Sequence, residues 1–337
     1  MELGVKPPAL LSRHQAFWKY VLGPQFIVFL LLVAIASTRQ WLGTRDTQNY
    51  IDNFNGFNGF SGQFEPGFEL LLWVVRLFDG NAIYFLFFCA IIGVGLKFIA
   101  INKYSTLVHL AIITYFAKYY FLHEMVQVRA GIAAGIFLVG IRYINEKKIV
   151  KFMITVAMAA LFHYSALIYL LAYFVCDERI DNRLFVGWLV VAVLIVFSFN
   201  LDEYLINRVA EWLPQVALYQ ELLNYGEYAR INFLNPDLLL REACIVLFVL
   251  IQKRMAPKIP MYDTWLKMMI LSVFTFYLLR RLPVLAFRLS ELMDVSMIFM
   301  FPGLVMVFKN RFTGFVVFVL VTSMTLFINF STLQTFF

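Results

Sequence analysis

Long apolar runs recur along most of the chain and alternate with short polar segments. At a rise of about 1.5 Å per residue, a helix made from each run comes close to crossing the roughly 30 Å hydrocarbon core of a bilayer. The pattern therefore predicts an all-α protein, a polytopic transmembrane helical bundle. The runs cover approximately residues 19–38, 81–101, 105–122, 125–144, 184–199, 238–252, 265–280, 285–308 and 312–333.

The apolar segment 150–175 differs from the others because the polar trio His163-Tyr164-Ser165 interrupts it near its centre. Basic residues beside the neighbouring runs place both ends of this segment on one side, so it cannot cross once. Its two pieces, of about eleven residues each, span about half a bilayer. We expect a re-entrant hairpin or two short helices, with the trio beside a cavity, in a bundle of about 9–11 spans. The alternative is a miscounted short span.

Two longer polar segments, 39–66 and 200–237, are expected on the opposite side from the basic clusters. The first contains the turn-forming repeat Asn55-Gly56 and Asn58-Gly59. The following segment, 68–78, is apolar but too short to span, so we expect it to lie along the outer surface. Segment 200–237 has helix-like periodicity and is expected to cap the bundle from outside.

The composition supports a membrane protein and excludes a water-soluble one, since 62% of the residues are hydrophobic and only 15% are charged. No polar region is long enough to fold alone, so residues 1–337 are interpreted as a single integral membrane domain. The net charge of +7 does not indicate nucleic-acid binding, because the basic residues lie in short clusters beside apolar runs. These clusters predict a cytoplasmic N-terminus and an extracytoplasmic C-terminus. They are Lys97 with Lys103, Arg142 to Lys151, Lys253 to Lys258, and Lys309 with Arg311.

Several cations fall within the outer halves of the predicted spans, where each is energetically costly. An arginine at the depth of Arg129 costs from about 2.5 to more than 10 kcal/mol, depending on how the cost is measured. Each cation taken singly is explained by an ion pair or by a side chain that reaches the interface. As a set, unpaired cations that converge from separate spans indicate a polyanionic ligand at the outer face. A lipid-linked diphosphate fits, because arginine matches phosphate oxygens in bidentate geometry. The set comprises Lys118, Arg129, Arg280, Arg281 and Arg288, with Glu291 and Asp294 nearby.

Carboxylates in the first outer loop and one histidine are candidates for a general base. A positioned base accelerates a reaction by about 10²–10⁴. Asp46, Glu65 and His163 are the catalytic candidates, and Glu69 lies close to them in the sequence. The alternatives are a helix N-cap or a pair with Arg45 for Asp46, a helix N-cap for Glu65, and a hydrogen-bonded core residue for His163. The sequence has no Asp-x-Asp pair and its three cysteines have no metal-binding spacing, so no metal or cofactor is predicted.

With these residues considered together, the chain resembles the EpsG-like, Wzy-type polysaccharide polymerases, which are membrane glycosyltransferases of the broad GT-C class. The motifs that carry the resemblance cover roughly residues 40–305. They are Asp46-x-x-x-Tyr50, Glu65-Pro-Gly-Phe68, Val126-Gln-Val-Arg-Ala-Gly-Ile-Ala133 running to Arg142-Tyr143, Phe162-His-Tyr-Ser-Ala166, and an arginine-containing span ending in Phe301-Pro-Gly303.

The resemblance implies that a glycan moves from one polyprenyl (undecaprenyl) diphosphate to a hydroxyl of a second lipid-linked unit, at the outer face of a bacterial cytoplasmic membrane. It also implies a chain-length regulator protein as a partner. Asp46, Glu65 or His163 would deprotonate the acceptor. The residues expected to bind the diphosphate or other parts of the substrate are Arg45, Tyr50, Glu69, Lys118, Gln127, Arg129, Tyr164, Arg280, Arg281 and Arg288.

Two other functions remain open at this stage. A membrane-bound O-acyltransferase would use His163, consume an acyl thioester and not need the arginines. A flippase or transporter for lipid-linked glycans would need a cationic cavity but no essential carboxylate, and would have inverted repeats, of which the sequence has no clear sign.

Overall fold

The computed structural model describes residues 23–39, 45–56, 64–175, 181–212 and 235–333, and their regular structure is helical throughout. The first half of the chain forms α2 (Pro24–Ser37), α3 (Arg45–Asn55), α4 (Pro66–Leu77), α5 (Ala82–Tyr104), α6 (Val108–Tyr115), the π-helix η2 (Phe116–Val126), α7 (Val128–Gly140), α8 (Arg142–Asn145), α9 (Ile149–Ala160), the 3₁₀ helix η3 (Tyr164–Tyr169) and α10 (Leu170–Val175). The second half forms α11 (Asn182–Ser198), α12 (Leu201–Trp212), α14 (Pro236–Met255), α15 (Tyr262–Leu278), α16 (Pro283–Asp294), α17 (Met297–Met300), η5 (Phe301–Gly303), α18 (Leu304–Val307) and α19 (Arg311–Leu333).

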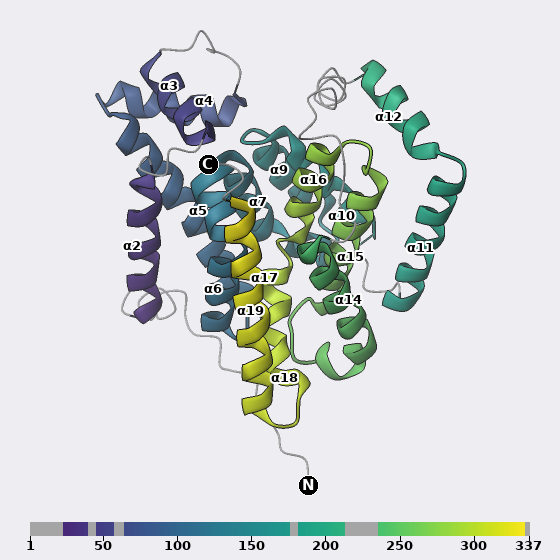
Figure 1. Ribbon diagram of the computed structural model, residues 1–337. Coiled ribbons are helices and arrows are strands. Elements are labelled where there is room, and N and C mark those ends of the chain that lie inside the picture. Colours follow the sequence, from purple (N-terminus) through teal and green to yellow (C-terminus); the bar gives the residue numbers. More distant parts are fainter. Residues whose placement is uncertain (1–22, 40–44, 57–63, 176–180, 213–234, 334–337) are drawn as a thin grey trace.

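The helices are arranged as a bundle, with α3 and α4 above one end and α11 and α12 at one edge (Figure 1). Within the described part of the chain, four helical segments are long and apolar enough to cross a membrane. They are α5, α7 with α8, α16 to α18, and α19. The shorter apolar helices α2, α9, η3 with α10, and α11 accompany them. The prediction of an all-α polytopic bundle is confirmed.

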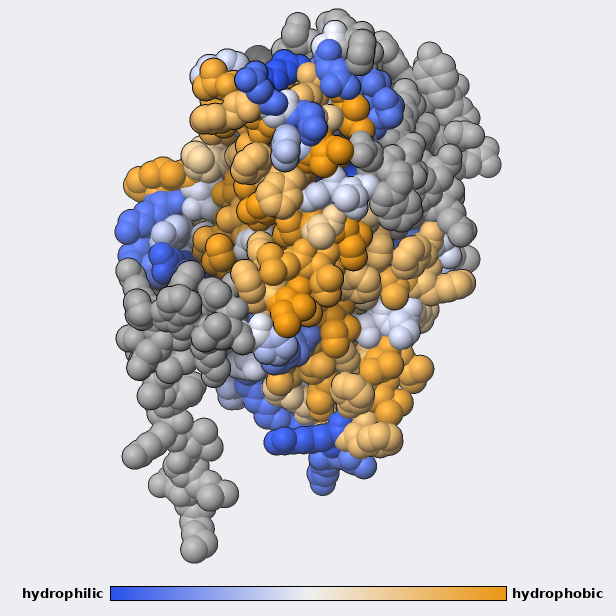
Figure 2. Space-filling view, turned by 90° about the vertical axis from the view of Figure 1, so that its left-hand side faces the viewer, coloured by the Kyte–Doolittle hydropathy of each residue, from blue (hydrophilic) through white to orange (hydrophobic). Residues whose placement is uncertain are grey.

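The outer surface of the bundle is apolar, as a lipid-facing surface must be. Hydrophobic side chains cover most of the middle of the face in Figure 2, and hydrophilic residues gather toward its upper and lower ends. Exposed side chains such as Trp188 on α11 and Phe327 on α19 are about as apolar as those in the core. Hydrophobic residues therefore fill the core and also cover the surface that faces lipid. This double use explains their high proportion in the sequence.

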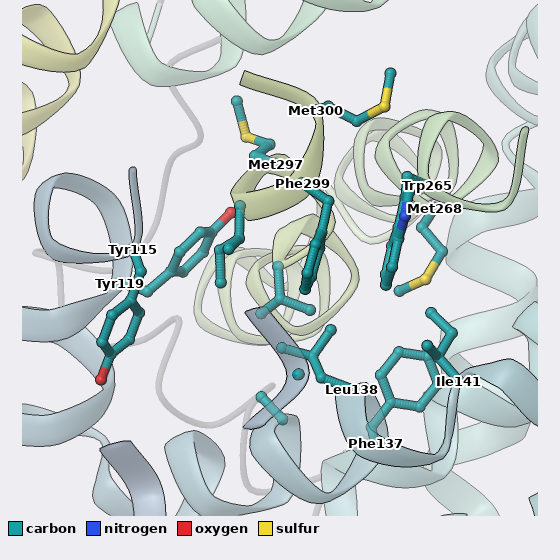
Figure 3. Packing of buried hydrophobic residues seen from close by; sticks show 14 of the residues in the cluster. Tyr115, Tyr119, Phe137, Leu138, Ile141, Trp265, Met268, Met297, Phe299 and Met300 are labelled. Atoms are coloured by element: carbon teal, nitrogen blue, oxygen red, sulfur yellow. The ribbon is translucent and has the colours of Figure 1, made fainter. Parts of the chain in front are cut away.

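Stacked aromatic rings join the helices at the centre of the bundle. Trp265 of α15 and Phe299 of α17 lie 4.1 Å apart with an interplanar angle of 10°, and Figure 3 shows their rings face to face. Phe137 of α7 stacks on Tyr169 of η3 with centroids 3.6 Å apart. Such rings each bury a large apolar area. As a result, α7 is held against η3, and α15 against α17.

The segment 150–175 forms the two short helical pieces that its interrupted pattern predicted. Phe152 near the start of α9 lies 5.3 Å from Tyr173 near the end of α10, measured between ring centroids, so the two pieces run antiparallel. Their junction contains His163, as expected. The junction meets the start of α4, where the Gly67 amide donates to the Leu161 carbonyl oxygen at 2.7 Å.

The helix α4 packs on the bundle through Phe68, Leu72 and Val75, which are buried. Its other faces carry exposed apolar side chains, including Leu70 and Trp73. A helix of this length is too short to span a bilayer but suits the interface between lipid and water. This agrees with the expectation that segment 68–78 lies along the surface.

One charge was placed wrongly by the sequence pattern. We predicted that Lys97 marks a turn together with Lys103, but Lys97 is fully buried and pairs with Glu124 of η2. Lys97 lies within α5, well before its end at Tyr104. Its partner comes 27 positions later and from another helix, so no local pattern could reveal the pair.

Candidate functional site

Glu65 occupies the N-cap position of α4, but its side chain does not cap the helix. Its backbone is extended (φ −65°, ψ 148°), Pro66 provides the first helical residue, and no hydrogen bond joins the Glu65 carboxylate to the amides of the first turn. Proline suits this position because it has no amide hydrogen to satisfy. The carboxylate is therefore free to point toward the bundle, and the interpretation of Glu65 as a simple side-chain cap is wrong.

The Glu65 carboxylate joins three groups from two other segments. Oε2 accepts a hydrogen bond from Nη1 of Arg129 at 2.5 Å. Oε1 lies 3.0 Å from Nδ1 of His163 and 3.3 Å from the amide nitrogen of Tyr164, which donates to it. The carboxylate is buried, with 5% of its side chain exposed. The structure thus brings together four residues that are separated by up to 99 positions in the sequence.

The surroundings of Glu65 keep it ionised. Burial by itself raises the pKa of the carboxyl group, but the hydrogen bond from His163 and the positive charge of Arg129 outweigh it, and the pKa falls to about 2. An ionised carboxylate can only accept hydrogen bonds. The Nδ1 atom of His163 must therefore carry the hydrogen in this contact, and Nε2 is the ring nitrogen left to accept a proton.

The lowered pKa of Glu65 predicts a specific dependence of stability on pH. Since the folded-state pKa, about 2, lies below the ordinary value of 4.5, ionised Glu65 stabilises the fold at pH values above 4.5. This contribution is lost as the pH falls from 4.5 toward about 2. We expect Glu65→Gln to unfold at a lower temperature than the wild type near neutral pH, and the difference to shrink in acid. Thermal unfolding of both purified proteins over this range tests it. A difference that does not vary with pH would contradict it.

Arg129 lies in the first turn of α7, directly after the break that ends η2 at Gln127. Its guanidinium carbon lies 4.8 Å from the centroid of the Phe64 ring and 6.0 Å from that of Tyr50. The side chain is 26% exposed, and its Nε has no hydrogen-bond partner among the described residues. The Nε atom is itself buried, so the part of Arg129 that a ligand can reach is the exposed 26% of the side chain, while Nη1 binds Glu65.

The remaining candidates of the first outer loop lie on α3 and α4. Tyr50 is buried between α3 and α4, with its ring 5.3 Å from that of Phe68. Asp46 is half-buried one turn earlier on α3. Glu69 follows Glu65 by one turn of α4, and its buried Oε1 has no hydrogen-bond partner within the described chain. Arg45 begins α3, but its side chain lies outside the described residues.

Tyr164 stands beside the carboxylate and is open to the surroundings. Its amide donates to Glu65, while the residue as a whole is 54% exposed. His163 itself is only 14% exposed at its side chain. At the junction of α9 and η3, the ring of His163 is therefore largely buried and the ring of Tyr164 is exposed.

Lys118 belongs to a second cluster of charges rather than to the first. Its ammonium group pairs with Asp237 of α14 and lies 3.6 Å from Asp294 of α16. Arg241 of α14 contacts the same two carboxylates, at 2.7 Å and 3.3 Å. Arg241 is not among the site residues predicted from the sequence. A signal was present, since Asn235-Pro236 starts a helix on which Asp237 and Arg241 are four residues apart.

Gln127 joins the break before α7 to α16. It lies at the break between η2 and α7, two residues before Arg129, and its Nε2 donates to Oε2 of Glu291 at 3.5 Å. Glu291 follows Arg288 by three residues on α16, and both are half-buried. The break therefore places the end of η2 against α16 and the start of α7 against α4.

The two adjacent arginines of the α15–α16 turn contact the corner between α11 and α12. The Arg280 guanidinium carbon lies 3.7 Å from the centroid of the Phe197 ring. Arg281 pairs with Glu203 at 3.2 Å and donates to the side chain of Asn200, also at 3.2 Å. The expectation of a set of unpaired cations is therefore wrong for Arg281, Lys118 and Arg129, each of which has an acidic partner. An unpaired charge in this environment is too costly for the folded chain.

A surface hollow of about 330 Å³ lies away from these charges. It is lined by Thr106 and by residues 256–263, which form the turn between α14 and α15. The polar trio at 163–165 does not line this hollow. No group of three or more His, Cys, Asp or Glu side chains within the described residues has an arrangement suited to a metal ion.

Fold and site together define a polytopic helical membrane protein in which a buried carboxylate is held between an arginine and a histidine. The model of the EpsG family matches residues 25–337, and the chain belongs to this family, whose members are similar to Wzy-type polysaccharide polymerases. No curated protein and no solved structure matches the chain.

Proposed function

We propose that this protein lengthens a polysaccharide by transferring a glycan from its polyprenyl diphosphate carrier to a hydroxyl group of a second lipid-linked unit. The observation that carries the proposal is the junction at Glu65, where one carboxylate binds both His163 and Arg129. Family membership supports a polysaccharide polymerase in general, and the junction supplies the two groups that such a transfer needs. One is a base for the incoming hydroxyl, and the other is a cation for the departing diphosphate.

In this scheme His163 acts as the general base. Its Nε2 accepts the proton of the acceptor hydroxyl as the oxygen attacks the anomeric carbon. Glu65 binds Nδ1–H, so it fixes the ring orientation and the tautomer and stabilises the imidazolium that forms. The new glycosidic bond forms as the bond between the anomeric carbon and the diphosphate oxygen breaks. The proton held by His163 then leaves to water.

Arg129 binds the leaving diphosphate. The negative charge on the diphosphate grows as its bond to the sugar breaks, and a fixed guanidinium stabilises this charge more in the transition state than in the ground state. The exposed part of the Arg129 side chain supports this role. The rings of Phe64 and Tyr50 lie against the guanidinium and help to keep it in place.

The proposed site faces the outside of the cytoplasmic membrane. Lys253 and Arg254 lie at the far end of α14 from Asp237, and Lys309 and Arg311 flank the turn before α19. Basic turns of this kind favour the cytoplasmic side. The interfacial helix α4 then lies at the outer leaflet, at the depth of a lipid-linked diphosphate.

Reconstitution with defined substrates tests the proposal. We expect purified protein given undecaprenyl diphosphate-linked repeat units to form a ladder of products that increase by one repeat each. We expect a chelator to leave the ladder unchanged, because the arginine takes the charge-stabilising role that a divalent metal has elsewhere. Electrophoresis of the products measures both. No ladder, or incorporation of an acyl group from a thioester instead, would contradict the proposed function.

A further inference from the structure

The position of Arg129 depends on the break between η2 and α7. The π-helix ends with the amide of Gln127 donating to the Leu122 carbonyl oxygen at 2.6 Å, and Gln127 itself leaves helical geometry (φ −94°, ψ 57°). The helix resumes at Val128, so Arg129 falls in its first turn. π-Helical turns are rare and occur often at functional sites.

Side chains from the preceding helices satisfy the carbonyl groups at this break. Nη1 of Arg39 donates to the Glu124 carbonyl oxygen at 2.9 Å, and Oγ1 of Thr47 donates to that of Met125 at 3.2 Å. Arg39 and Thr47 are both buried. Irregular backbone at this depth is stable only when its polar groups find partners inside the protein. The break is therefore held in one geometry by contacts distant in sequence.

Lys97 and Glu124 form a buried ionic clasp across the same break. Lys97 pairs with Oε1 of Glu124, and its ammonium group also donates to the Gly131 carbonyl oxygen at 2.8 Å. Oε1 of Glu124 accepts a further hydrogen bond from the Tyr115 hydroxyl at 3.0 Å. Both charged side chains are fully buried. The clasp thus joins α5 and η2 to the first turn of α7, two residues after Arg129.

We infer that Lys97 and Glu124 are positioning residues that set the place of Arg129 at the site. This inference rests on the proposed function. A buried ion pair is weak evidence for stability, since apolar residues of similar size are often as good or better. The hydrogen bond from Lys97 to the Gly131 carbonyl oxygen has a defined direction, which an apolar contact lacks. It therefore fixes the position along the helix axis and the rotation of the turn that carries Arg129. Neither residue contacts Glu65, His163 or Arg129 through any bond described above.

Two glycines of α5 provide a matched test. A Cβ on Gly93 would occupy the space of Oε2 of Glu124, whereas a Cβ on Gly95 would meet only the Phe29 ring at an ordinary 3.8 Å. Gly93→Ala therefore displaces the clasp while it keeps both charges, and Gly95→Ala makes the same chemical change on the same helix. We expect Gly93→Ala to bind undecaprenyl diphosphate about tenfold more weakly and to polymerise more slowly, since small misplacements of a catalytic group are costly. We expect Gly95→Ala to behave as the wild type.

A second variant removes the clasp without leaving an unpaired charge. The double substitution Lys97→Met with Glu124→Leu is expected to stay folded, with a melting temperature close to that of the wild type, and to bind the diphosphate at least tenfold more weakly. Normal diphosphate binding by folded Gly93→Ala or by the folded double variant would overturn the inference alone. A wild-type protein that binds no undecaprenyl diphosphate would overturn the proposed function, and this inference with it.

Discussion

Replacing Arg129 with alanine is expected to abolish detectable polymer growth, with a loss in rate of at least about 10²–10³. The guanidinium is the group proposed to stabilise the departing diphosphate, and 26% of the Arg129 side chain is exposed. Alanine also leaves the buried Glu65 without its cation, so the variant must be shown to be folded. Product ladders measure the rate, and size-exclusion chromatography with thermal unfolding measures the fold. Arg129→Lys keeps the charge and is expected to recover part of the activity.

Arg281 supplies the matched control for this prediction. The sequence alone gave it the same role as Arg129, but in the structure it pairs with Glu203 and Asn200 at the corner between α11 and α12. We expect Arg281→Ala to lower the rate less than tenfold, since surface ion pairs contribute about 0–1 kcal/mol. Polymerisation that survives loss of Arg129 but not loss of Arg281 would overturn the assignment of the diphosphate site.

Replacing His163 with glutamine is expected to lower turnover by about 10²–10⁴ while the binding of both substrates changes little. Glutamine retains hydrogen-bonding groups for Glu65 but cannot accept a proton at the position of Nε2. Steady-state rates with varied acceptor concentration separate turnover from binding. His109, an exposed histidine of α6, is the control, and its replacement by glutamine is expected to have no effect.

The partnership between His163 and Glu65 adds a stricter form of the same test. If Glu65 acts by orienting the ring, Glu65→Gln slows turnover, and adding it to His163→Gln costs little more than His163→Gln alone. Additive losses would show that the two residues act separately. Loss of turnover in Asp46→Asn, together with normal turnover in His163→Gln, would assign the base to Asp46 instead.

The residues of the candidate site could be predicted from the sequence, but the contacts between them could not. Arg129, Glu65 and His163 were each recognisable, because a charge, a Pro-Gly corner and a polar trio interrupt apolar surroundings. The unpaired state expected for Arg129 was wrong, since its partner Glu65 lies 64 positions earlier, at the start of an interfacial helix. The residues of the further inference were missed for the same reason. In the sequence, Lys97 and Glu124 each lie near the end of an apolar run and have no distinguishing feature. Only the fold shows that they form an ion pair.

The sequence by itself determined that this chain is a helical membrane protein and where most of its apolar runs lie, and it indicated that segment 150–175 forms two short pieces rather than one span. These properties follow from hydrophobic runs, turn residues and the distribution of basic residues, all of which act over one helix length or less. Only the tertiary structure decided which charge neutralises which, and that the break at Gln127 brings Arg129 to Glu65. Inside an apolar bundle each charge must find a partner, and the choice of partner depends on how the helices pack rather than on neighbours in the sequence.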